Sequence, residues 1–206
     1  MKFYPIKTPI IVQKLFSNYC WRFSSSVKEI YLTFDDGPTP EITTYVLNEL
    51  NKYRAKATFF CIGKNVKKNH AIFERIIEEG HSIGNHTHHH LNGFKTNNSS
   101  YIKNICQAAE LIESKLFRPP YGRLKLSQAK SITNLGYKII MWDVLSADFD
   151  SKITPEKCLK NVISKTTNGS IIVMHDSYKS KDKLLYALPK ILSHFSERGY
   201  VFKAIC

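Results

Sequence analysis

Short apolar runs alternate with helix-like stretches along this chain, and this alternation limits the possible fold more than any other feature. The apolar runs cover residues 30–34, 57–61, 81–84, 138–142, 170–174 and 200–205. The helix-like stretches cover residues 41–53, 71–79, 101–114, 124–135, 155–165 and 183–198. Because strands that alternate with helices form βα units, the pattern predicts an α/β fold with a mainly parallel sheet. The chain has 206 residues, no internal repeat and no low-complexity linker, so a single domain is expected.

A pair of carboxylates and a histidine run supply the parts of a metal site. Asp35 and Asp36 lie in the segment TFDDGP, and His86 and His90 bound the segment HTHHH. On a helical turn, histidines four residues apart project from one face and can bind one ion. A catalytic zinc takes three nitrogen, oxygen or sulfur ligands from the protein and keeps one position open. One aspartate would complete such a site, and the other could accept a proton from the attacking water.

Each of these motifs alone also has a structural interpretation. In a strand, consecutive side chains point to opposite faces, so Asp35 and Asp36 can share a cavity only if the alternation breaks at Gly37-Pro38. Asp-Gly-Pro is common in turns, and a histidine-rich tract can be a solvated loop. Together, however, the two motifs favour metal-assisted hydrolysis.

Two further motifs support the hydrolase interpretation. The segment RPPYG at 118–122 fixes an extended backbone by its prolines and then turns at glycine. This geometry can aim the Tyr121 amide at a developing oxyanion. The apolar run at 170–174 predicts a buried strand that delivers His175 to the rim of a site. A lone histidine after a strand is more often structural, but its combination with the other motifs favours a functional role.

In order along the chain, the motifs are TFDDGP, HTHHH, RPPYG, WDVLSADFD and the apolar run that ends at His175. This ordered set resembles the polysaccharide deacetylases of carbohydrate esterase family four, also called the NodB homology domain. The resemblance covers residues 30–206, nearly the whole chain. It implies an irregular (β/α) barrel with about seven parallel strands. Residues 1–29 would be a short N-terminal extension that packs on the barrel.

The resemblance also implies roles for individual polar residues. Asp36, His86 and His90 would bind a divalent metal ion, which the family suggests is zinc, although cobalt or nickel can occupy similar ligand sets. Asp35 would be the general base. His175 would be the general acid that protonates the leaving amine.

One wall of the site departs from the family pattern. The family often has Asp at the position of Leu145 and Trp at the position of Phe149, so substrate preference can differ here. Arg118 would orient the base, and a positive charge beside a carboxylate keeps it ionised. Asp148 is the expected partner of Arg118, with Asp143 as the second candidate.

The wall of the site is expected to bind an acetylated substrate. Tyr121 would lend its backbone N–H to the oxyanion. The residues expected to contact the substrate are Pro119, Pro120, Trp142, Leu145 and Met174. An N-acetyl amide is a poor electrophile, so a metal ion must polarise its carbonyl and lower the pKa of the attacking water from about 15.7 toward 7.

The predicted function is therefore metal-dependent removal of N-acetyl groups from an amino-sugar glycan, which could be chitin-like, peptidoglycan or exopolysaccharide. Two alternatives within the hydrolases are an O-acetyl esterase and a deacylase of a non-sugar amide. A third alternative, from a different class, is a catalytically weak glycan-binding protein. The presence of every proposed ligand and of both proton-transfer groups favours the enzyme.

The chain is strongly basic, with 30 Lys and Arg, 17 Asp and Glu and a formal net charge of +13. This charge suits nucleic acid, but the lysines are scattered and no aromatic-basic recognition motif accompanies them, so no nucleic-acid partner is expected. An acidic glycan, a wall polymer, an anionic membrane surface or no partner at all fits the charge equally well. The protein is expected to be a monomer.

The cysteines and the N-terminal segment indicate in which cellular compartment the protein is expected. Five cysteines without a CxxC pair indicate reduced thiols, and Cys61, which ends an apolar run, is expected to be buried. Residues 1–23 contain only a short apolar run at 9–12, too short for a signal-peptide core or a membrane span. A cytoplasmic or non-classically exported protein is expected, although this segment could also lie against a membrane.

Overall fold

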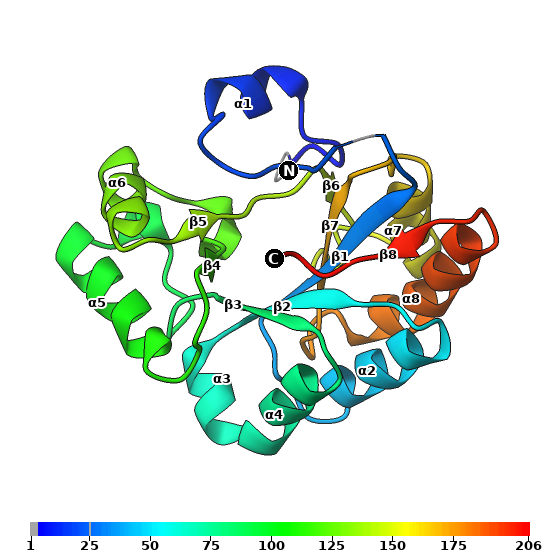
Figure 1. Cartoon of the computed structure of the whole chain (residues 1–206), viewed down its shortest axis with the longest axis horizontal. Coiled ribbons are helices and arrows are strands. Elements are labelled where there is room, and N and C mark those ends of the chain that lie inside the picture. Colours follow the sequence, from blue (N-terminus) through cyan, green and yellow to red (C-terminus); the bar gives the residue numbers. More distant parts are fainter. Residues whose placement is uncertain (1–3, 25) are drawn as a thin grey trace.

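A curled sheet of parallel strands forms the centre of the protein (Figure 1). The computed structural model describes residues 4–24 and 26–206. Along the sheet, the strand order is β5-β4-β3-β2-β1-β7-β6, and every neighbouring pair is parallel. The strands are β1 (Glu29–Asp35), β2 (Ala57–Cys61), β3 (Ser82–Asn85), β4 (Leu116–Phe117), β5 (Lys138–Ile139), β6 (Val144–Leu145) and β7 (Ile171–His175). An eighth strand, β8 (Val201–Phe202), pairs with the start of β1. The prediction of an irregular α/β barrel with seven parallel strands is confirmed.

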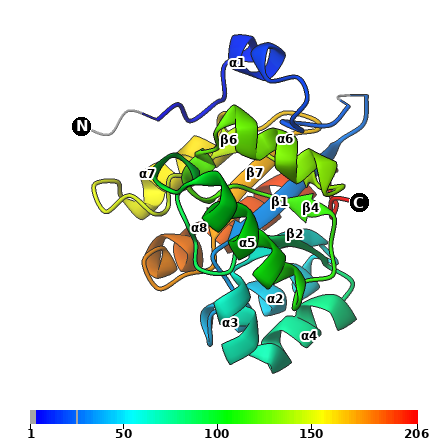
Figure 2. The same ribbon diagram turned by 90° about the vertical axis from the view of Figure 1, so that its left-hand side faces the viewer.

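Helices surround the sheet on its outer side (Figures 1 and 2). They are α1 (Ile10–Leu15), α2 (Ile42–Lys52), α3 (Gly63–Lys68), α4 (His70–Glu78), α5 (Asn98–Ala109), α6 (Leu126–Asn134), α7 (Pro155–Ile163) and α8 (Lys181–Ser196), with two 3-10 turns, η1 (Gly93–Lys95) and η2 (Pro120–Gly122). All the helices expected from the sequence are present, with ends displaced by a few residues. The short helices α1 and α3 were not predicted, because six residues are too few to show a helical repeat.

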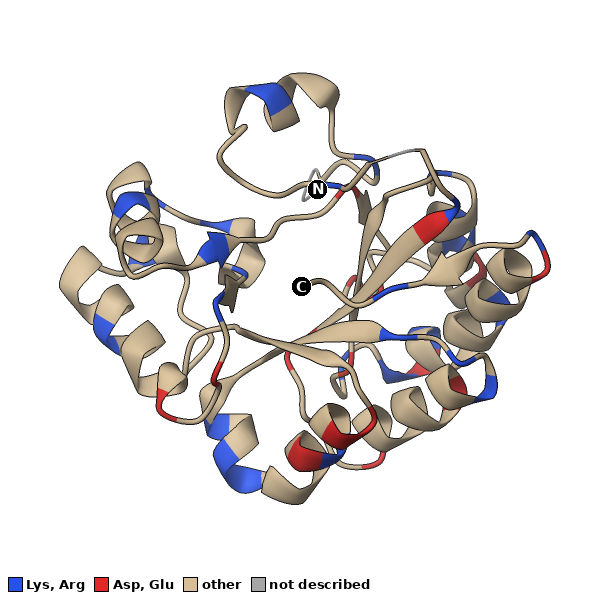
Figure 3. Cartoon of the chain, in the orientation of Figure 1, with Lys and Arg blue, Asp and Glu red and all other residues tan. Residues whose placement is uncertain are grey.

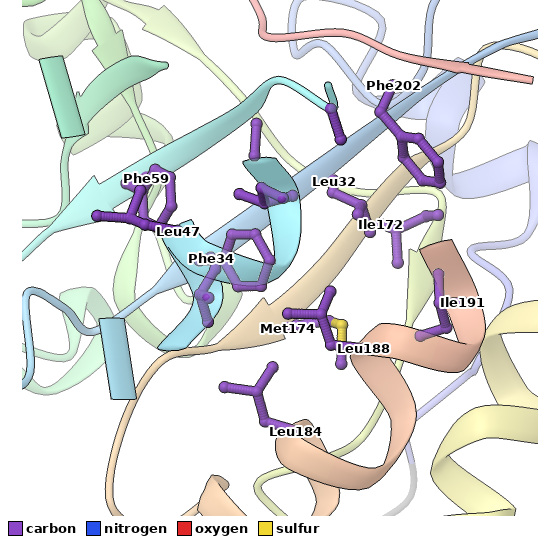
Figure 4. Packing of buried hydrophobic residues seen from close by; sticks show 14 of the residues in the cluster. Leu32, Phe34, Leu47, Phe59, Ile172, Met174, Leu184, Leu188, Ile191 and Phe202 are labelled. Atoms are coloured by element: carbon purple, nitrogen blue, oxygen red, sulfur yellow. The ribbon is translucent and has the colours of Figure 1, made fainter. Parts of the chain in front are cut away.

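The main hydrophobic core lies between the sheet and the helices α2 and α8 (Figure 4). The register of β1 and β7 pairs Leu32 with Ile172 and Phe34 with Met174, and all four side chains are buried. Figure 4 shows Met174 beside Leu188 of α8. Full burial of an aliphatic or aromatic side chain contributes about 1.5–3 kcal/mol relative to exposure. The two central strands are therefore a rigid support for the residues at their ends.

The N-terminal segment bridges the two edge strands of the sheet. Lys7 pairs antiparallel with Val144 of β6, and Cys20 pairs in parallel with Ile140, directly after β5. The connecting helix α1 lies across the open side of the barrel in Figure 1. The segment thus closes a seam that the seven strands leave open.

The basic side chains are spread over the fold, and the cysteines lie both in the core and at the surface. Figure 3 shows Lys and Arg on helices all around the molecule instead of in one stripe. The five cysteines are free thiols, and Cys61 is buried as expected. Among the described residues, no helix combines the length and apolar character needed to cross a membrane.

Candidate active site

The C-terminal ends of the parallel strands bring the candidate residues together. The register of β1 and β7 pairs Asp35 with His175, so the expected base and acid leave neighbouring strands at the same level. Asp36 follows Asp35 with a φ of 82°, which breaks the strand alternation before Gly37. Because this residue is in the left-handed region, the two consecutive carboxylates do not have to point to opposite faces.

The buried carboxylate of Asp176 holds this turn. It accepts hydrogen bonds from the Gly37 N–H at 3.1 Å and from the Thr43 hydroxyl at 2.5 Å. A Cβ at Gly37 would lie 2.0 Å from Asp176 Oδ2, so only glycine allows this close approach. Burial raises the pKa of Asp176 to about 7, despite these hydrogen bonds. No role was predicted for Asp176, although it directly follows His175.

Asp36, His86 and His90 converge on one point. Their ligand atoms all lie within 4.8 Å of one another. His90 Nε2 is 3.1 Å and His86 Nε2 is 3.7 Å from Asp36 Oδ1, a buried oxygen that has no hydrogen-bond partner. The His86 Nδ1–H donates to the carbonyl of Arg118 at 2.7 Å, which leaves Nε2 free to bind an ion. Two imidazoles and one carboxylate with an unsatisfied oxygen fit a divalent metal with an open coordination position.

The protonation states of His86 and Asp36 also favour metal binding. Burial lowers the pKa of His86 to about 4, so its imidazole is neutral, the form that binds metal. Burial by itself would raise the pKa of Asp36, but the neighbouring imidazoles of His90 and His175 lower it below its usual range. The carboxylate is therefore ionised.

The histidine motif is a loop, so the predicted helical turn at 86–90 is wrong. Thr87 and His90 have φ values of 63° and 55°. Side-chain amides hold the loop: Asn85 Oδ1 accepts from the Thr87 N–H at 2.8 Å, and Asn104 Oδ1 accepts from the His88 N–H at 2.9 Å. The two ligand rings still approach each other, because these left-handed residues reverse the chain between them.

Arg118 holds the expected base. Its guanidinium is fully buried and donates from Nη1 to Asp35 Oδ1 at 2.7 Å and to the Thr33 hydroxyl at 2.6 Å. The carbonyls of Ile140 and Met141 accept further hydrogen bonds from it at 3.2 and 3.0 Å. The Asp35 carboxylate is consequently fixed in one orientation.

The expected pairing of Arg118 with Asp148 or Asp143 is wrong. Asp148 lies under His175, where its two oxygens accept from the His175 backbone N–H and from Nδ1–H, each at 2.7 Å. Asp143 is buried and bonds to Lys7 Nζ at 2.5 Å. The loop after β6 passes beside β7, and this brings Asp148 to the histidine.

The His175–Asp148 pair forms the other side of the site. Burial opposes the imidazolium form, but the charge and hydrogen bond of Asp148 outweigh it and raise the pKa of His175 to about 10. The imidazole is therefore protonated near neutral pH and can act as a proton donor. Asp35 and His175, at the ends of β1 and β7, thus lie close to the cluster of Asp36, His86 and His90.

A sequence model of the family described as polysaccharide deacetylase matches residues 24–140. The chain belongs to the polysaccharide deacetylase family. A peptidoglycan N-acetylglucosamine deacetylase of Bacillus cereus is 32% identical to this deacetylase over 191 residues, which cover 90% of each chain. The deacetylase is thus a hydrolase of the polysaccharide N-deacetylase class.

Solved structures agree with this assignment. The crystal structure of a peptidoglycan N-acetylglucosamine deacetylase in complex with 4-naphthalen-1-yl-N-oxidanyl-benzamide superposes with a TM-score of 0.88 at 32% identity, over 96% of this chain and 95% of that chain. A pseudoenzyme of carbohydrate esterase family four from Bacillus anthracis gives a TM-score of 0.77 at 25% identity, over 90% of this chain and 66% of that chain. Since a pseudoenzyme shares the fold, the mechanism has to be argued from the side chains of the site.

The residues expected to contact the oxyanion and the substrate differ in their exposure to solvent. Tyr121 has a φ of 60°, is exposed, and places its ring 4.5 Å from the ring of His90. Half-buried Trp142 lies directly under Gly122, where an added Cβ would be 2.7 Å from the indole. The participation of these residues in catalysis and binding stays a prediction.

The other expected substrate residues are buried. Pro119 and Pro120 are buried in the RPPYG segment, and Leu145 is 5% exposed at the end of β6. Met174 is fully buried in the core against α8 (Figure 4), so the structure does not bring it to the site. The reason is the strand alternation: Met174 and His175 are consecutive in β7 and point to opposite faces.

Proposed function

We propose that this deacetylase removes N-acetyl groups from N-acetylglucosamine units of peptidoglycan, with a divalent metal ion as cofactor. The observation that carries the proposal is the convergence of Asp36, His86 and His90 beside a buried Asp35–Arg118 pair and a His175–Asp148 pair. The names of its relatives support the choice of glycan.

Asp36, His86 and His90 would hold the ion. Two nitrogen ligands and one oxygen ligand with an open position match catalytic zinc, and cobalt or nickel suits the same donors. Bound there, a divalent ion would polarise the acetyl carbonyl and acidify the attacking water. The three ligands come from two loops that hydrogen bonds hold in place, so the site is formed before substrate arrives.

Asp35 would accept a proton from the attacking water. The buried guanidinium of Arg118 keeps its carboxylate ionised and aimed in one direction. The water oxygen then forms a bond to the carbonyl carbon, and the Tyr121 N–H would stabilise the charge on the carbonyl oxygen. Fixed orientation of the base is what lets it act within hydrogen-bond reach of the water.

His175 would complete the reaction as the acid. It donates its Nε2 proton to the amide nitrogen as the carbon–nitrogen bond breaks, which releases acetate and the free amino sugar. Asp148 binds Nδ1–H and stabilises the imidazolium that serves as donor. General bases and acids of this kind each contribute about 100- to 10,000-fold in rate.

A substrate panel tests the proposal. Metal-stripped protein, with and without zinc or cobalt, is incubated with peptidoglycan fragments, N-acetylglucosamine oligomers and O-acetylated sugars, and acetate release is measured. We expect zinc-restored release from the peptidoglycan fragments. Release from esters alone would establish an esterase. No release from any of them, with one equivalent of metal bound, would support a glycan-binding protein that lacks catalysis.

A further inference from the structure

Residues 4–8 form an N-terminal strap on the acid side of the site. We propose that this strap is a positioning element for catalysis, in which Tyr4 fixes the loop that carries Asp148 and thereby the orientation of His175. The inference rests on the proposed role of His175 as general acid. It assigns a function to a segment that lies outside the family motifs.

The strap pairs with the outer edge of β6 through its backbone. The Leu145 N–H donates to the carbonyl of Ile6, and the Thr8 N–H donates to the carbonyl of Asp143, both at 2.9 Å. The Thr8 hydroxyl donates to the carbonyl of Trp142 at 2.8 Å. The strap therefore runs antiparallel to β6 and shares its register.

An ion pair between Lys7 and the buried Asp143 fixes this register. Lys7 Nζ lies 2.5 Å from Asp143 Oδ2 and also donates to the carbonyl of Lys165 at 2.9 Å. The Asp143 side chain is fully buried and accepts a second hydrogen bond from the Ser170 hydroxyl at 2.6 Å. A slipped strap would leave the buried Asp143 carboxylate without this charge partner and is therefore disfavoured.

Tyr4, three residues before Lys7, contacts the loop after β6. Its hydroxyl donates to Asp150 Oδ2 at 2.5 Å, and its ring centroid is 5.4 Å from that of Phe149. The Phe149 ring in turn meets the ring of His175 edge-on, with centroids 5.3 Å apart. Tyr4 thus touches the two residues that follow Asp148, and one of them packs directly against the acid.

The loop between β6 and these contacts needs such support. Ala147 has a φ of 62°, and a left-handed non-glycine residue persists only where its surroundings hold it. The strap holds the loop at both ends, by backbone pairing at β6 and by Tyr4 at 149–150. Without Tyr4, Asp148 and the His175 ring would sample other positions, and a displacement of about 1 Å at a catalytic group can cost about 100-fold in rate.

Kinetics of Tyr4 variants test the proposal. With N-acetylglucosamine oligomers and zinc-loaded protein, Tyr4→Ala should lower kcat by about 100-fold and leave KM and metal content nearly unchanged. Tyr4→Phe keeps the ring contact and should recover most of kcat. Asp150→Asn weakens the hydrogen bond to the Tyr4 hydroxyl and keeps the ring contact, so it too should retain most of kcat. The matched control is Tyr186→Ala, because Tyr186 lies on α8 and its ring is covered by Lys190 of the same helix, 3.8 Å from the ring centroid.

Two comparisons separate positioning from general destabilisation. In an Asp148→Asn background, Tyr4→Ala should cause little further loss of kcat, because both act through His175. The His175 ring signals in NMR spectra should broaden or split in Tyr4→Ala and not in Tyr186→Ala. An unchanged kcat in Tyr4→Ala, or an equal loss in both backgrounds, would overturn the proposal. If the wild-type protein releases no acetate, the proposed function fails, and the His175 spectra alone decide whether the strap positions the histidine.

Discussion

The buried ion pair between Arg118 and Asp35 offers the sharpest test of how this site is built. The Arg118 guanidinium is fully buried, and Asp35 is 4% exposed. Arg118→Met removes the donor to Asp35 at 2.7 Å and leaves that buried carboxylate without its ion-pair partner. Removing one partner of a buried pair typically costs about 3–5 kcal/mol, so we expect a loss of that size in the free energy of unfolding. Apolar side chains in place of both partners remove this uncompensated charge.

Urea unfolding of metal-free protein measures this effect. The single variants Arg118→Met and Asp35→Leu should each lower the unfolding midpoint, whereas the double variant should lose less than the sum of the two. Arg123→Met is the matched control: Arg123 is exposed and lies over the Phe94 ring at 5.5 Å, so its loss should change stability by no more than about 0.5 kcal/mol. Additive losses, or a loss in Arg118→Met as small as in the control, would show that Arg118 does not compensate the buried charge of Asp35.

Three further predictions concern charge, metal and surface. Because Asp148 raises the pKa of His175 to about 10 from its ordinary 6.5, the pair should stabilise metal-free protein fully below pH 6.5 and progressively less as the pH rises to 10. Asp148→Asn should remove this pH dependence in thermal unfolding, and an unchanged profile would contradict the assignment. His86→Ala and His90→Ala should each abolish stoichiometric zinc binding in metal analysis, and one retained equivalent would refute the ligand set. Finally, α1 exposes Ile10, Ile11 and Leu15 on a protein with a net positive charge. Vesicles that contain anionic lipid should therefore co-sediment with the wild-type protein but not with a variant that has serine at these three positions. Equal co-sedimentation of the two proteins would exclude this membrane contact.

The parts of the fold that could be predicted have local causes. The strand β2 consists of five consecutive apolar or β-branched residues, and its bounds follow from that run. The helix α7 begins at Pro155 as predicted, because Thr154 caps it and proline is tolerated at the first helical position. In contrast, β4 and β6 contain two residues each, and only pairing with neighbouring strands makes them strands.

In the site, too, local sequence predicts some features and tertiary contacts determine the others. The motifs predicted one cluster of Asp36, His86 and His90, and the structure brings these three residues together. Their loop conformation could not be predicted, because it depends on Asn104, a side chain on a later helix. The predicted pairing of Asp148 with Arg118 was also wrong. Whether Asp148 meets Arg118 or His175 depends on how the loop after β6 packs beside β7, which the sequence does not show. Spacing along the chain thus identifies the chemical groups, and tertiary packing decides which groups meet.

If Asp35 is the base and other residues hold the metal, replacing Asp35 should remove activity and spare metal binding. Metal content and acetate release are therefore measured for Asp35→Asn and wild-type protein on peptidoglycan fragments. We expect one equivalent of zinc in both proteins and a loss in acetate release of about 100- to 10,000-fold in the variant. Wild-type rates in Asp35→Asn with zinc still bound would contradict this role of Asp35.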